Sequence, residues 1–215
     1  MLNIALPKGR LGDKVYNILK DAGYDCPDYE NKDRLLVLES PENGVRYLLV
    51  KPSDVAIYVE HHAADVGIVG KDILLESNPD VYELLDLNIG KCRMAVAAPK
   101  GYEEDPDRTL RIATKFVNVA KKHYAEKNRE IEIIKLNGSI ELAPILGLSD
   151  VIVDIVETGT TLKENGLVVL EEVCDLSACV VVNQVSMKME NERITQILAG
   201  IRELLEQNPN EKRRI

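Results

Sequence analysis

One stretch, residues 151–166, limits the possible fold more than any other part of the sequence. It begins with Val151–Val156, which are almost all β-branched and apolar, and this predicts a strand buried on both faces, as in a parallel sheet. Small hydroxylic residues around Gly159 follow, and then the pattern of a short helix over 162–165 that ends at Gly166. A strand, a hydroxyl-rich loop and a helix in this order predict one unit of an α/β sheet.

The loop in this stretch predicts an anion site. Backbone N–H groups, Thr hydroxyls and the partial positive charge of a helix N-terminus would face one small space, which suits phosphate. The loop is not a Walker A sequence, because no Gly-Lys-Ser/Thr follows at the required spacing. It resembles the loop with which phosphoribosyltransferases hold the 5′-phosphate of phosphoribosyl pyrophosphate (PRPP), with the carboxylates Asp154 and Glu157 separated instead of adjacent. For the loop alone, an ordinary capped helix after a core strand is the alternative.

The composition excludes several classes of protein. The formal charge is −9 and the pI is about 5.0, which opposes non-specific binding to nucleic acid. The sequence contains no run of about 18 apolar residues, and Met1–Lys8 lacks the features of a signal peptide. We therefore expect a cytoplasmic protein that binds neither nucleic acid nor a membrane. The histidines show no metal-ligand spacing, so we expect no dedicated protein site for a metal.

The first part of the chain predicts further strand-end loops. Strands over 2–6, 45–50 and 65–69 each run into a charged or glycine-containing loop and then a helix, the second of which Ser53 or Asp54 would cap. Ligands bind at the carboxyl ends of strands in open parallel α/β sheets. Solvated surface charges, and tight strand–helix packing at the glycines, are the alternatives. The residues at these strand ends are Lys8, Gly9, Arg10, Lys51, Gly67, Gly70, Lys71 and Asp72.

A second α/β alternation begins near residue 110. Strands over 110–113 and 131–136 flank a helix that starts at Thr114, and Ser139 is expected to cap a helix that carries Glu141. The strand ends around Ser139 and Thr158 should then share one edge of a sheet. The other expected elements are strands over 35–38, 92–97, 167–173 and 179–185 and an amphipathic helix over 190–207.

Five segments, in this order, resemble the short form of the ATP phosphoribosyltransferases, which catalyse the first step of histidine biosynthesis. No single motif is decisive, but the order is specific and spans nearly the whole chain. Val117 departs from the pattern, because the family often has proline there, and we expect it to change a local turn. The segments are Ala5–Leu11, Ala64–Asp72, Arg111–Lys115, Leu136–Pro144 and Asp154–Leu167.

The resemblance implies a periplasmic-binding-protein-like α/β fold of two lobes with the active site between them. By analogy the first lobe is 1–90 plus 181–215, and the second is 91–180 and carries the PRPP phosphate loop. The implied reaction joins N1 of ATP to C1 of PRPP and releases pyrophosphate. Ribosyl transfer passes through an oxocarbenium-like state that nearby carboxylates stabilise.

The resemblance also implies roles for particular residues. The candidates for catalysis are Asp154, Glu141 and Lys8. Mg²⁺ would be held through substrate phosphates, with Asp154 as a candidate protein ligand. The candidates for substrate binding are Lys8, Gly9, Arg10, Lys51, Gly67, Gly70, Lys71, Asp72, Ser139, Glu157, Thr158, Gly159, Thr160 and Thr161.

A partner is the last implication of the resemblance. After the expected helix that ends near Gln207, the eight residues 208–215 are too few for a regulatory domain. We therefore expect a separate regulatory subunit resembling histidyl-tRNA synthetase in a hetero-oligomer, and a homodimer when the chain is alone. The alternatives are a ligand-sensing module of the same fold without chemistry, and a phosphoribosyltransferase that acts on another base.

Overall fold

The computed structural model describes residues 1–207, which form two compact units. The first unit contains Met1–Leu74, Asn78–Gly90 and the described chain from Ser177 onward, and the second contains Leu75–Ser77 and Lys91–Leu176. Residues 208–215 lie outside the described residues, so the expectation that they form no domain stays a prediction. Each unit is an α/β layer structure, and the predicted α/β class is confirmed.

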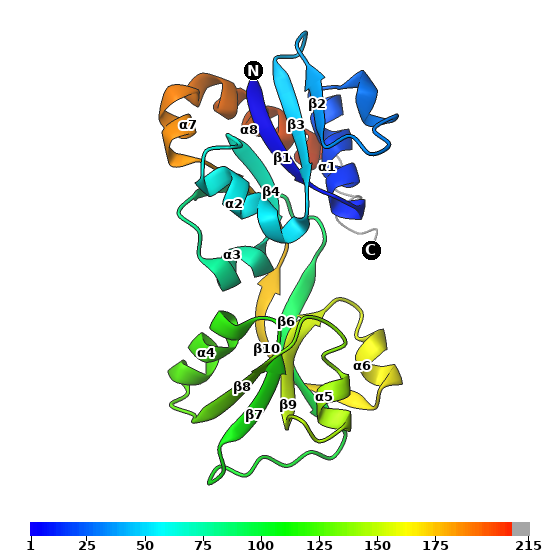
Figure 1. Ribbon diagram of the computed structural model, residues 1–215, viewed down its shortest axis with the longest axis vertical. Helices are drawn as coiled ribbons and strands as arrows, with labels where there is room; N and C mark the ends of the chain where they lie inside the picture. Colours follow the sequence, from blue (N-terminus) through cyan, green and yellow to red (C-terminus); the bar gives the residue numbers. More distant parts are fainter. Residues whose placement is uncertain (208–215) are drawn as a thin grey trace. The chain divides into compact units, whose positions relative to one another are not determined.

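The described part of the first unit is built on a mixed six-stranded sheet in the order β2-β3-β1-β4-β11-β5 (Figure 1). β3, β1 and β4 are parallel, whereas β2, β11 and β5 each pair antiparallel with a neighbour. The three parallel strands therefore end at one edge of the sheet. The strands are β1 (Leu2–Pro7), β2 (Val37–Ser40), β3 (Val45–Val50), β4 (Val66–Gly70), β5 (Tyr82–Asp86) and β11 (Ala178–Val182).

Helices cover both faces of this sheet and bury its apolar side chains. α1 and α8 pack on one face around a core that includes Ile4, Leu6 and Tyr47. α2 and α3 pack on the other face, against Ala5 and Val181. The helices are α1 (Arg10–Asp21), α2 (Val55–Glu60), α3 (Lys71–Ser77), α7 (Gln184–Met189) and α8 (Asn191–Gln207), with 3-10 turns η1 (Pro27–Tyr29) and η2 (Pro52–Asp54).

The second unit contains a five-stranded sheet in the order β10-β6-β9-β7-β8 (Figure 1). β9, β7 and β8 are parallel, and β6 and β10 complete the sheet with antiparallel pairing. α4 packs on one face, and α5 and α6 pack on the other. The elements are β6 (Cys92–Pro99), β7 (Leu110–Thr114), α4 (Val117–Glu126), β8 (Ile131–Lys135), α5 (Leu142–Ile145), β9 (Val151–Val156), α6 (Thr160–Glu164) and β10 (Leu167–Leu176).

The strand predicted from residues 151–156 is present as β9, but its expected burial is only partly right. Val151–Val153 are buried, whereas Ile155 is 36% exposed. One neighbour, β7, is parallel, but the other, β6, is antiparallel. The strand is buried on both helix-covered faces near its start, whereas near its carboxyl end Ile155 is exposed and Val156 stays buried.

Two predicted helix caps are wrong. Ser139 has a positive φ of 49°, while a capping residue needs extended backbone, and its carbonyl accepts the N–H of Leu142 instead. Glu141 is the residue before α5 and makes no side-chain capping bond. Before α2, a 3-10 turn intervenes, and the hydroxyl of Ser53 donates to Asp54 at 2.8 Å instead of capping the helix.

Two other boundaries differ from the sequence prediction. β5 was not predicted, because its residues alternate weakly and stay partly exposed. The strand expected over 179–185 ends at Val182, because the side chain of Asn183 accepts the N–H groups of Val185 and Ser186 and so begins α7. Asn183 is an extended capping residue that the apolar run before it concealed.

A buried polar network ties the first unit together at the amino end of β4. The carboxylate of Asp65 accepts the backbone N–H of Asn3 at 2.7 Å and the hydroxyl of Ser186 at 2.6 Å. The amide of Asn183 donates to the carbonyl of Val59 at 2.8 Å. These bonds join β1, β4, α2 and α7. Each of them replaces a hydrogen bond to water that the buried group lost on folding.

Gly12 allows α1 to approach the end of β1 closely. A Cβ at this position would lie 1.9 Å from the carbonyl oxygen of Pro7. The first turn of α1 therefore packs directly on the strand end that leads into Lys8 and Gly9. Because backbone and not a flexible side chain would be hit, the collision cannot be relieved locally.

We predict that Gly12→Ala destabilises the protein by about 2 kcal/mol or more, because the added methyl overpacks the α1–β1 contact. Helix propensity alone predicts the opposite sign, a gain of about 1 kcal/mol. Urea unfolding measures the free energy of unfolding and therefore distinguishes these two predictions. Gly138→Ala is the matched control, since nothing lies within 4 Å of the position that its added methyl would take. A Gly12→Ala protein as stable as the control variant would contradict the packing account.

Candidate functional site

The carboxyl edge of the second sheet collects the polar groups predicted from sequence. β7, β8 and β9 are parallel, so the residues that follow Thr114, Lys135 and Val156 lie along one edge. The segment 136–141, with Ser139 and Glu141, follows β8, and the hydroxyl-rich loop follows β9. The structure thus brings these two strand ends to the same edge, as the sequence predicts.

Asp154 is the carboxylate that the fold holds most firmly at this edge. It lies on the face of β9 that α5 and α6 cover and is half-buried. Burial raises the pKa of Asp154, and the neighbouring Glu141 raises it further. The N–H of Ile155, which donates to the carboxylate at 2.8 Å, and the charge of Lys115 lower the pKa in part. The charges of Glu141 and Lys115 therefore both act on the Asp154 carboxylate.

The hydroxyl-rich loop presents its donors to solvent. Gly159 adopts the left-handed conformation with φ 77°, which ordinary side chains rarely adopt, and it directly precedes α6. The hydroxyls of Thr158 and Thr160 lie 2.9 Å apart, and the N–H of Thr160 points to the Thr158 hydroxyl at 3.3 Å. Glu157, Thr158, Thr160 and Thr161 are all exposed. The loop can therefore offer hydroxyl and backbone donors to a phosphate without first breaking buried contacts.

The carboxyl edge of the first sheet carries a group of exposed cations. Lys8 and Arg10 follow β1, with Gly9 between them at φ 102°. Lys51 follows β3, and the register pairs Pro7 with Val50, so Lys8 and Lys51 leave neighbouring strands side by side. The backbone N–H of Lys8 donates to the carbonyl of Val50 at 2.8 Å, which fixes this arrangement. Such a cluster suits a polyanionic ligand.

The other candidates at this edge have structural neighbours. The ammonium of Lys71 forms an ion pair with Glu83 at 2.6 Å. A Cβ on Gly67 would lie 2.6 Å from Val59 of α2, and one on Gly70 would lie 2.2 Å from the carboxylate of Asp72. Close packing against valine side chains accounts for Gly67, whereas the Asp72 carboxylate beside Gly70 is the end of a side chain that can rotate, and the substrate-binding role of both glycines stays a prediction.

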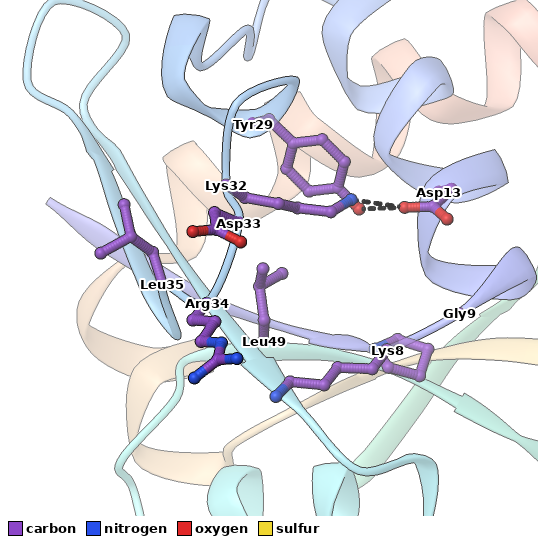
Figure 2. A pocket seen from close by; sticks show the side chains of 10 residues that line it. Lys8, Gly9, Asp13, Tyr29, Lys32, Asp33, Arg34, Leu35 and Leu49 are labelled. Carbon is purple, nitrogen blue, oxygen red and sulfur yellow. Dashed lines mark hydrogen bonds and ion pairs between the residues drawn. The ribbon is translucent and has the colours of Figure 1, made fainter.

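A pocket of about 200 Å³ opens next to these cations in the first unit (Figure 2). The side chains of Lys8 and Arg34 extend toward the same space, with Leu49 behind them. Sequence reasoning missed Arg34 and Lys32, because they lie in a segment without periodicity. The run Lys32-Asp33-Arg34 after η1 was the available signal. The lining residues are Pro7, Lys8, Gly9, Asp13, Tyr29, Lys32, Asp33, Arg34, Leu35 and Leu49.

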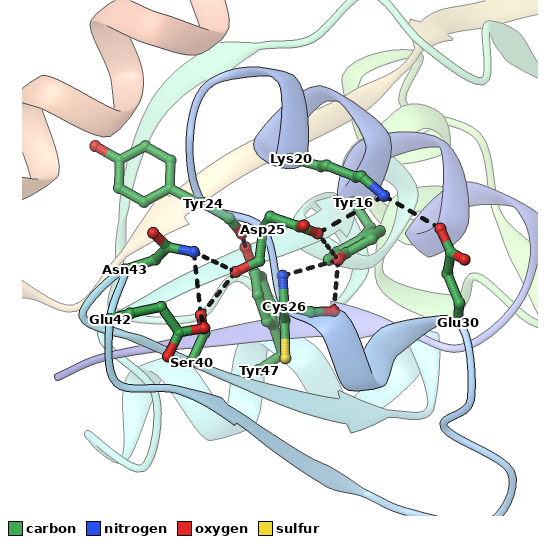
Figure 3. A network of polar contacts seen from close by, with 10 residues as sticks. All are labelled: Tyr16, Lys20, Tyr24, Asp25, Cys26, Glu30, Ser40, Glu42, Asn43 and Tyr47. Carbon is green, nitrogen blue, oxygen red and sulfur yellow. Dashed lines mark hydrogen bonds and ion pairs between the residues drawn. The ribbon is translucent and has the colours of Figure 1, made fainter.

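One wall of the pocket is anchored by stacked tyrosines. The rings of Tyr16 and Tyr29 stack with centroids 3.4 Å apart. The phenol of Tyr16 donates to Asp25 at 2.7 Å and accepts the N–H of Cys26 at 2.9 Å (Figure 3). Burial is the main reason that the pKa of Tyr16 and that of Tyr29 are raised, so both phenols stay protonated. Asp13 accepts from Tyr29 at 3.0 Å, and this fixes the segment that leads to Arg34.

The described part of the chain contains neither a clustered metal site nor a membrane span. In residues 1–207, no group of three or more His, Cys, Asp or Glu side chains is arranged to hold a metal ion. Across the same residues, no helix has the length and apolar character needed to cross a bilayer.

Comparison with known proteins identifies relatives over almost the entire chain. A family model described as "HisG: ATP phosphoribosyltransferase" matches residues 51–203. An ATP phosphoribosyltransferase of Brachyspira hyodysenteriae is 59% identical over 206 residues, which cover 95% of this chain and 100% of the relative. One from Lachnoclostridium phytofermentans is 55% identical over 95% of this chain and 97% of its own length.

Two solved structures share the fold of this chain. The ATP phosphoribosyltransferase (HisG:HisZ) complex from Thermotoga maritima contains a chain with a TM-score of 0.85 and 40% identity, covering 96% of this chain and 100% of that one. The periplasmic aliphatic sulphonate binding protein SsuA from Escherichia coli has a TM-score of 0.60 at 11% identity, covering 98% of this chain and 70% of its own, and shows the fold alone. The predicted periplasmic-binding-protein-like fold is confirmed. The strand-end loops, the extent of the sequence match and the shared fold agree, and the chain belongs to the ATP phosphoribosyltransferase (HisG) family.

Proposed function

We propose that this protein joins N1 of the adenine of ATP to C1 of PRPP and releases pyrophosphate, the first step of histidine biosynthesis. Family membership supports the reaction. The observation that carries the assignment of the site is the position of half-buried Asp154 on the same sheet edge as the exposed loop Thr158–Thr161. A carboxylate beside a phosphate-binding loop is the arrangement that ribosyl transfer requires.

The second unit would hold PRPP. The 5′-phosphate would accept bonds from the hydroxyl and N–H donors of Thr158–Thr161, with Gly159 allowing close backbone approach. Asp154, in its ionised form, would stabilise the positive charge that develops on the ribose, and Glu141 and Glu157 are the next carboxylates along the edge. Exposed Ser139 follows β8 at this edge and would add a hydroxyl.

The first unit would hold anionic parts of the substrates. Lys8, Arg10 and Lys51 present exposed charges at neighbouring strand ends, which suits a triphosphate or the departing pyrophosphate. Lys71 and Asp72 are weaker candidates, because Lys71 is already paired with Glu83. The lobes we assign to these tasks are 1–90 plus 181–215 and 91–180.

Mg²⁺ would assist the reaction through the substrates. The donor set fits this ion, because a few carboxylates such as Asp154 and Glu141 stand at the edge while no three-ligand cluster exists among residues 1–207. Mg²⁺ keeps several waters and binds through substrate phosphates plus one or two carboxylates. Calorimetry with Mg²⁺ alone should show no tight binding, and a micromolar site without substrate would contradict this assignment.

A regulatory subunit similar to HisZ would complete the enzyme in the cell. The relative from Thermotoga maritima was solved as a HisG:HisZ complex, and that chain is covered in full by this one. Turnover and histidine inhibition should be measured for the isolated chain and again after the partner is added. Full turnover with histidine inhibition by the isolated chain would contradict the need for a partner.

The family match disfavours the two alternatives, a sensing module without chemistry and a transferase for another base. An assay of pyrophosphate release from PRPP distinguishes the proposed reaction from both alternatives. We expect release with ATP and Mg²⁺ and no comparable release with free adenine, guanine or orotate. Release with another base would reassign the substrate, and tight PRPP binding without release under any condition, with or without the partner, would favour the sensing module.

We predict that Thr161→Ala weakens PRPP binding by about tenfold or more, since a hydrogen bond to a charged group contributes roughly 1.5–3 kcal/mol. Gly159→Val should weaken it further, because valine resists the left-handed backbone of this position. Thr161→Ser, which keeps the hydroxyl, is the matched control and should bind nearly as well as the wild type. Unchanged PRPP affinity in Thr161→Ala and Gly159→Val would remove the loop from the site.

We predict that Asp154→Asn abolishes most of the activity and stabilises the folded protein at neutral pH. Burial raises the folded-state pKa of Asp154 above that of the unfolded chain, so the ionised carboxylate disfavours folding at high pH. The stability gain of the variant should therefore shrink as pH falls through the folded-state pKa.

Asp150→Asn is the matched control for this prediction. Arg111 donates to Asp150 at 2.7 Å and lowers its pKa, so this carboxylate stabilises the fold at neutral pH. Thermal unfolding between pH 4 and 8.5 should give opposite signs for the two variants. A loss of stability in Asp154→Asn at pH 8 would contradict the account.

A further inference from the structure

Asp13, in the first turn of α1, is the meeting point of two side chains from the segment that follows this helix. Its carboxylate accepts the phenol O–H of Tyr29 at 3.0 Å and forms an ion pair with the ammonium of Lys32 at 2.6 Å (Figure 2). The same ammonium lies over the ring of Tyr29, 3.7 Å from its centroid. Asp13, Tyr29 and Lys32 thus contact one another pairwise, and we call these three side chains the clamp.

The clamp rests on a buried base of tyrosines. The ring of Tyr29 is buried and stacks on that of Tyr16, with 4° between the two planes. Tyr47, a fully buried residue of β3, meets both rings edge to face. Tyr29 is therefore fixed by the core of the first unit, and it gives Lys32 and Asp13 a stationary surface to pack against.

A tight turn links the position of Lys32 to that of Arg34. The N–H of Leu35 donates to the carbonyl of Lys32 at 2.7 Å, which closes a turn over residues 32–35. Asp33, inside this turn, has a φ of 39°, in the left-handed region that aspartate adopts more readily than most residues. Arg34 is the other inner residue of the turn. The direction of its side chain consequently depends on where the clamp holds Lys32.

The charges that line the pocket are divided between the clamp and the open space. Lys32 is occupied by Asp13, whereas the side chains of Lys8 and Arg34 extend toward the space itself (Figure 2). The planar guanidinium of Arg34 suits phosphate oxygens. An exposed arginine on an unsupported loop would have to be ordered when a ligand binds, and this ordering lowers affinity. A turn that is fixed in advance avoids most of that loss.

We propose that Asp13 is a positioning residue, which holds Lys32 and Tyr29 so that Arg34 is directed, beside Lys8, at a polyphosphate group. The inference rests on the proposed function, in which the first unit binds anionic parts of the substrates, and deepens it by naming what preorganises one cation. Asp13 acts through Arg34 and needs no contact with the substrate. A carboxylate in the lining of an anion site repels the anion, so its presence there calls for a structural reason, and the clamp supplies one.

The first test measures the affinity of the full chain for inorganic pyrophosphate by calorimetry. Arg34→Gln should weaken binding about tenfold or more, through loss of hydrogen bonds to a charged group. Asp13→Asn should weaken binding roughly threefold to tenfold, because Arg34 would then become ordered only on binding. Charge alone predicts the opposite sign, since this variant removes a negative group from the pocket. Unchanged or tighter binding of pyrophosphate by Asp13→Asn would overturn the proposal.

A double variant separates positioning from a general loss of structure. When Asp13→Asn is combined with Arg34→Gln, binding should be no weaker than in Arg34→Gln alone, because Asp13 acts through Arg34. Losses that add in full would overturn the proposal. Asp13→Glu keeps the carboxylate and should retain most of the affinity. Asp21→Asn, which removes an exposed carboxylate from the other end of α1, is the matched control and should change nothing.

Hydrogen exchange without ligand gives a readout that needs neither binding nor activity. In Asp13→Asn, peptides that cover 30–36 should exchange faster than in the wild type, while those that cover β1 and β3 should not change. Unchanged exchange over 30–36 would overturn the clamp and leave the proposed function intact. Faster exchange and weaker pyrophosphate binding, in a protein that releases no pyrophosphate from PRPP and ATP with or without the partner, would support the clamp and overturn the proposed function.

Discussion

Parallel strand pairing is the constraint on which the rest of this structure depends. In each unit three neighbouring strands run in the same direction, so all three deliver the residues that follow them to one edge of the sheet. Segments far apart in the sequence, such as Lys115 and the loop after Val156, thereby become neighbours. The helices that return the chain cover both faces and leave this edge as the place where polar side chains stay accessible.

The same constraint explains why the carboxylate of Asp154, which we propose to be catalytic, carries an energetic cost. Asp154 lies on a face that is otherwise filled by Ala95, Ile152 and Val156, so the carboxylate loses water when the chain folds. Asp150, at the opposite end of the same strand segment, shows the contrasting case, because it is paired with Arg111. If only stability mattered, both carboxylates would be paired with a cation, as Asp150 is with Arg111. The unfavourable environment of Asp154 therefore supports the proposal that this residue serves the reaction.

The sequence predicted the elements well wherever one periodicity prevailed. The strands ending at Pro7, Val50 and Val156 and the long helix α8 follow directly from apolar runs and a 3.6-residue stripe. The predicted caps at Ser139 and Ser53 failed, because the identity of a capping residue does not fix its backbone angles. Ser139 is left-handed, and a 3-10 turn follows Lys51, and neither conformation can be read from residue type alone.

The sequence predicted which loops form the candidate site. It did not predict which side chains from other strands and segments lie beside those loops. Hydroxyl-rich and glycine-containing strand ends marked the loops around Thr158 and Lys8. The nearness of the end of β7 to Asp154 arises from strand order, which places β7 next to β9, and no local pattern encodes that order. Arg34 was missed because its segment has no periodicity, and the stacking of Tyr29 on Tyr16, which holds this segment, is a tertiary contact. Gly67 packs against Val55 and Val59, which accounts for a glycine there without a ligand, and its predicted role in substrate binding stays a prediction.

The central claim is that PRPP binds at the carboxyl edge of the second sheet, against Asp154 and the hydroxyl-rich loop. Hydrogen–deuterium exchange of the full chain, with and without PRPP and Mg²⁺, measures this directly. The account predicts slower exchange in peptides that cover 136–141 and 157–161, because the ligand would cover or bond to backbone of residues that are mostly exposed there. Protection confined to Lys8–Arg10 and Lys51, with no change at 157–161, would contradict it.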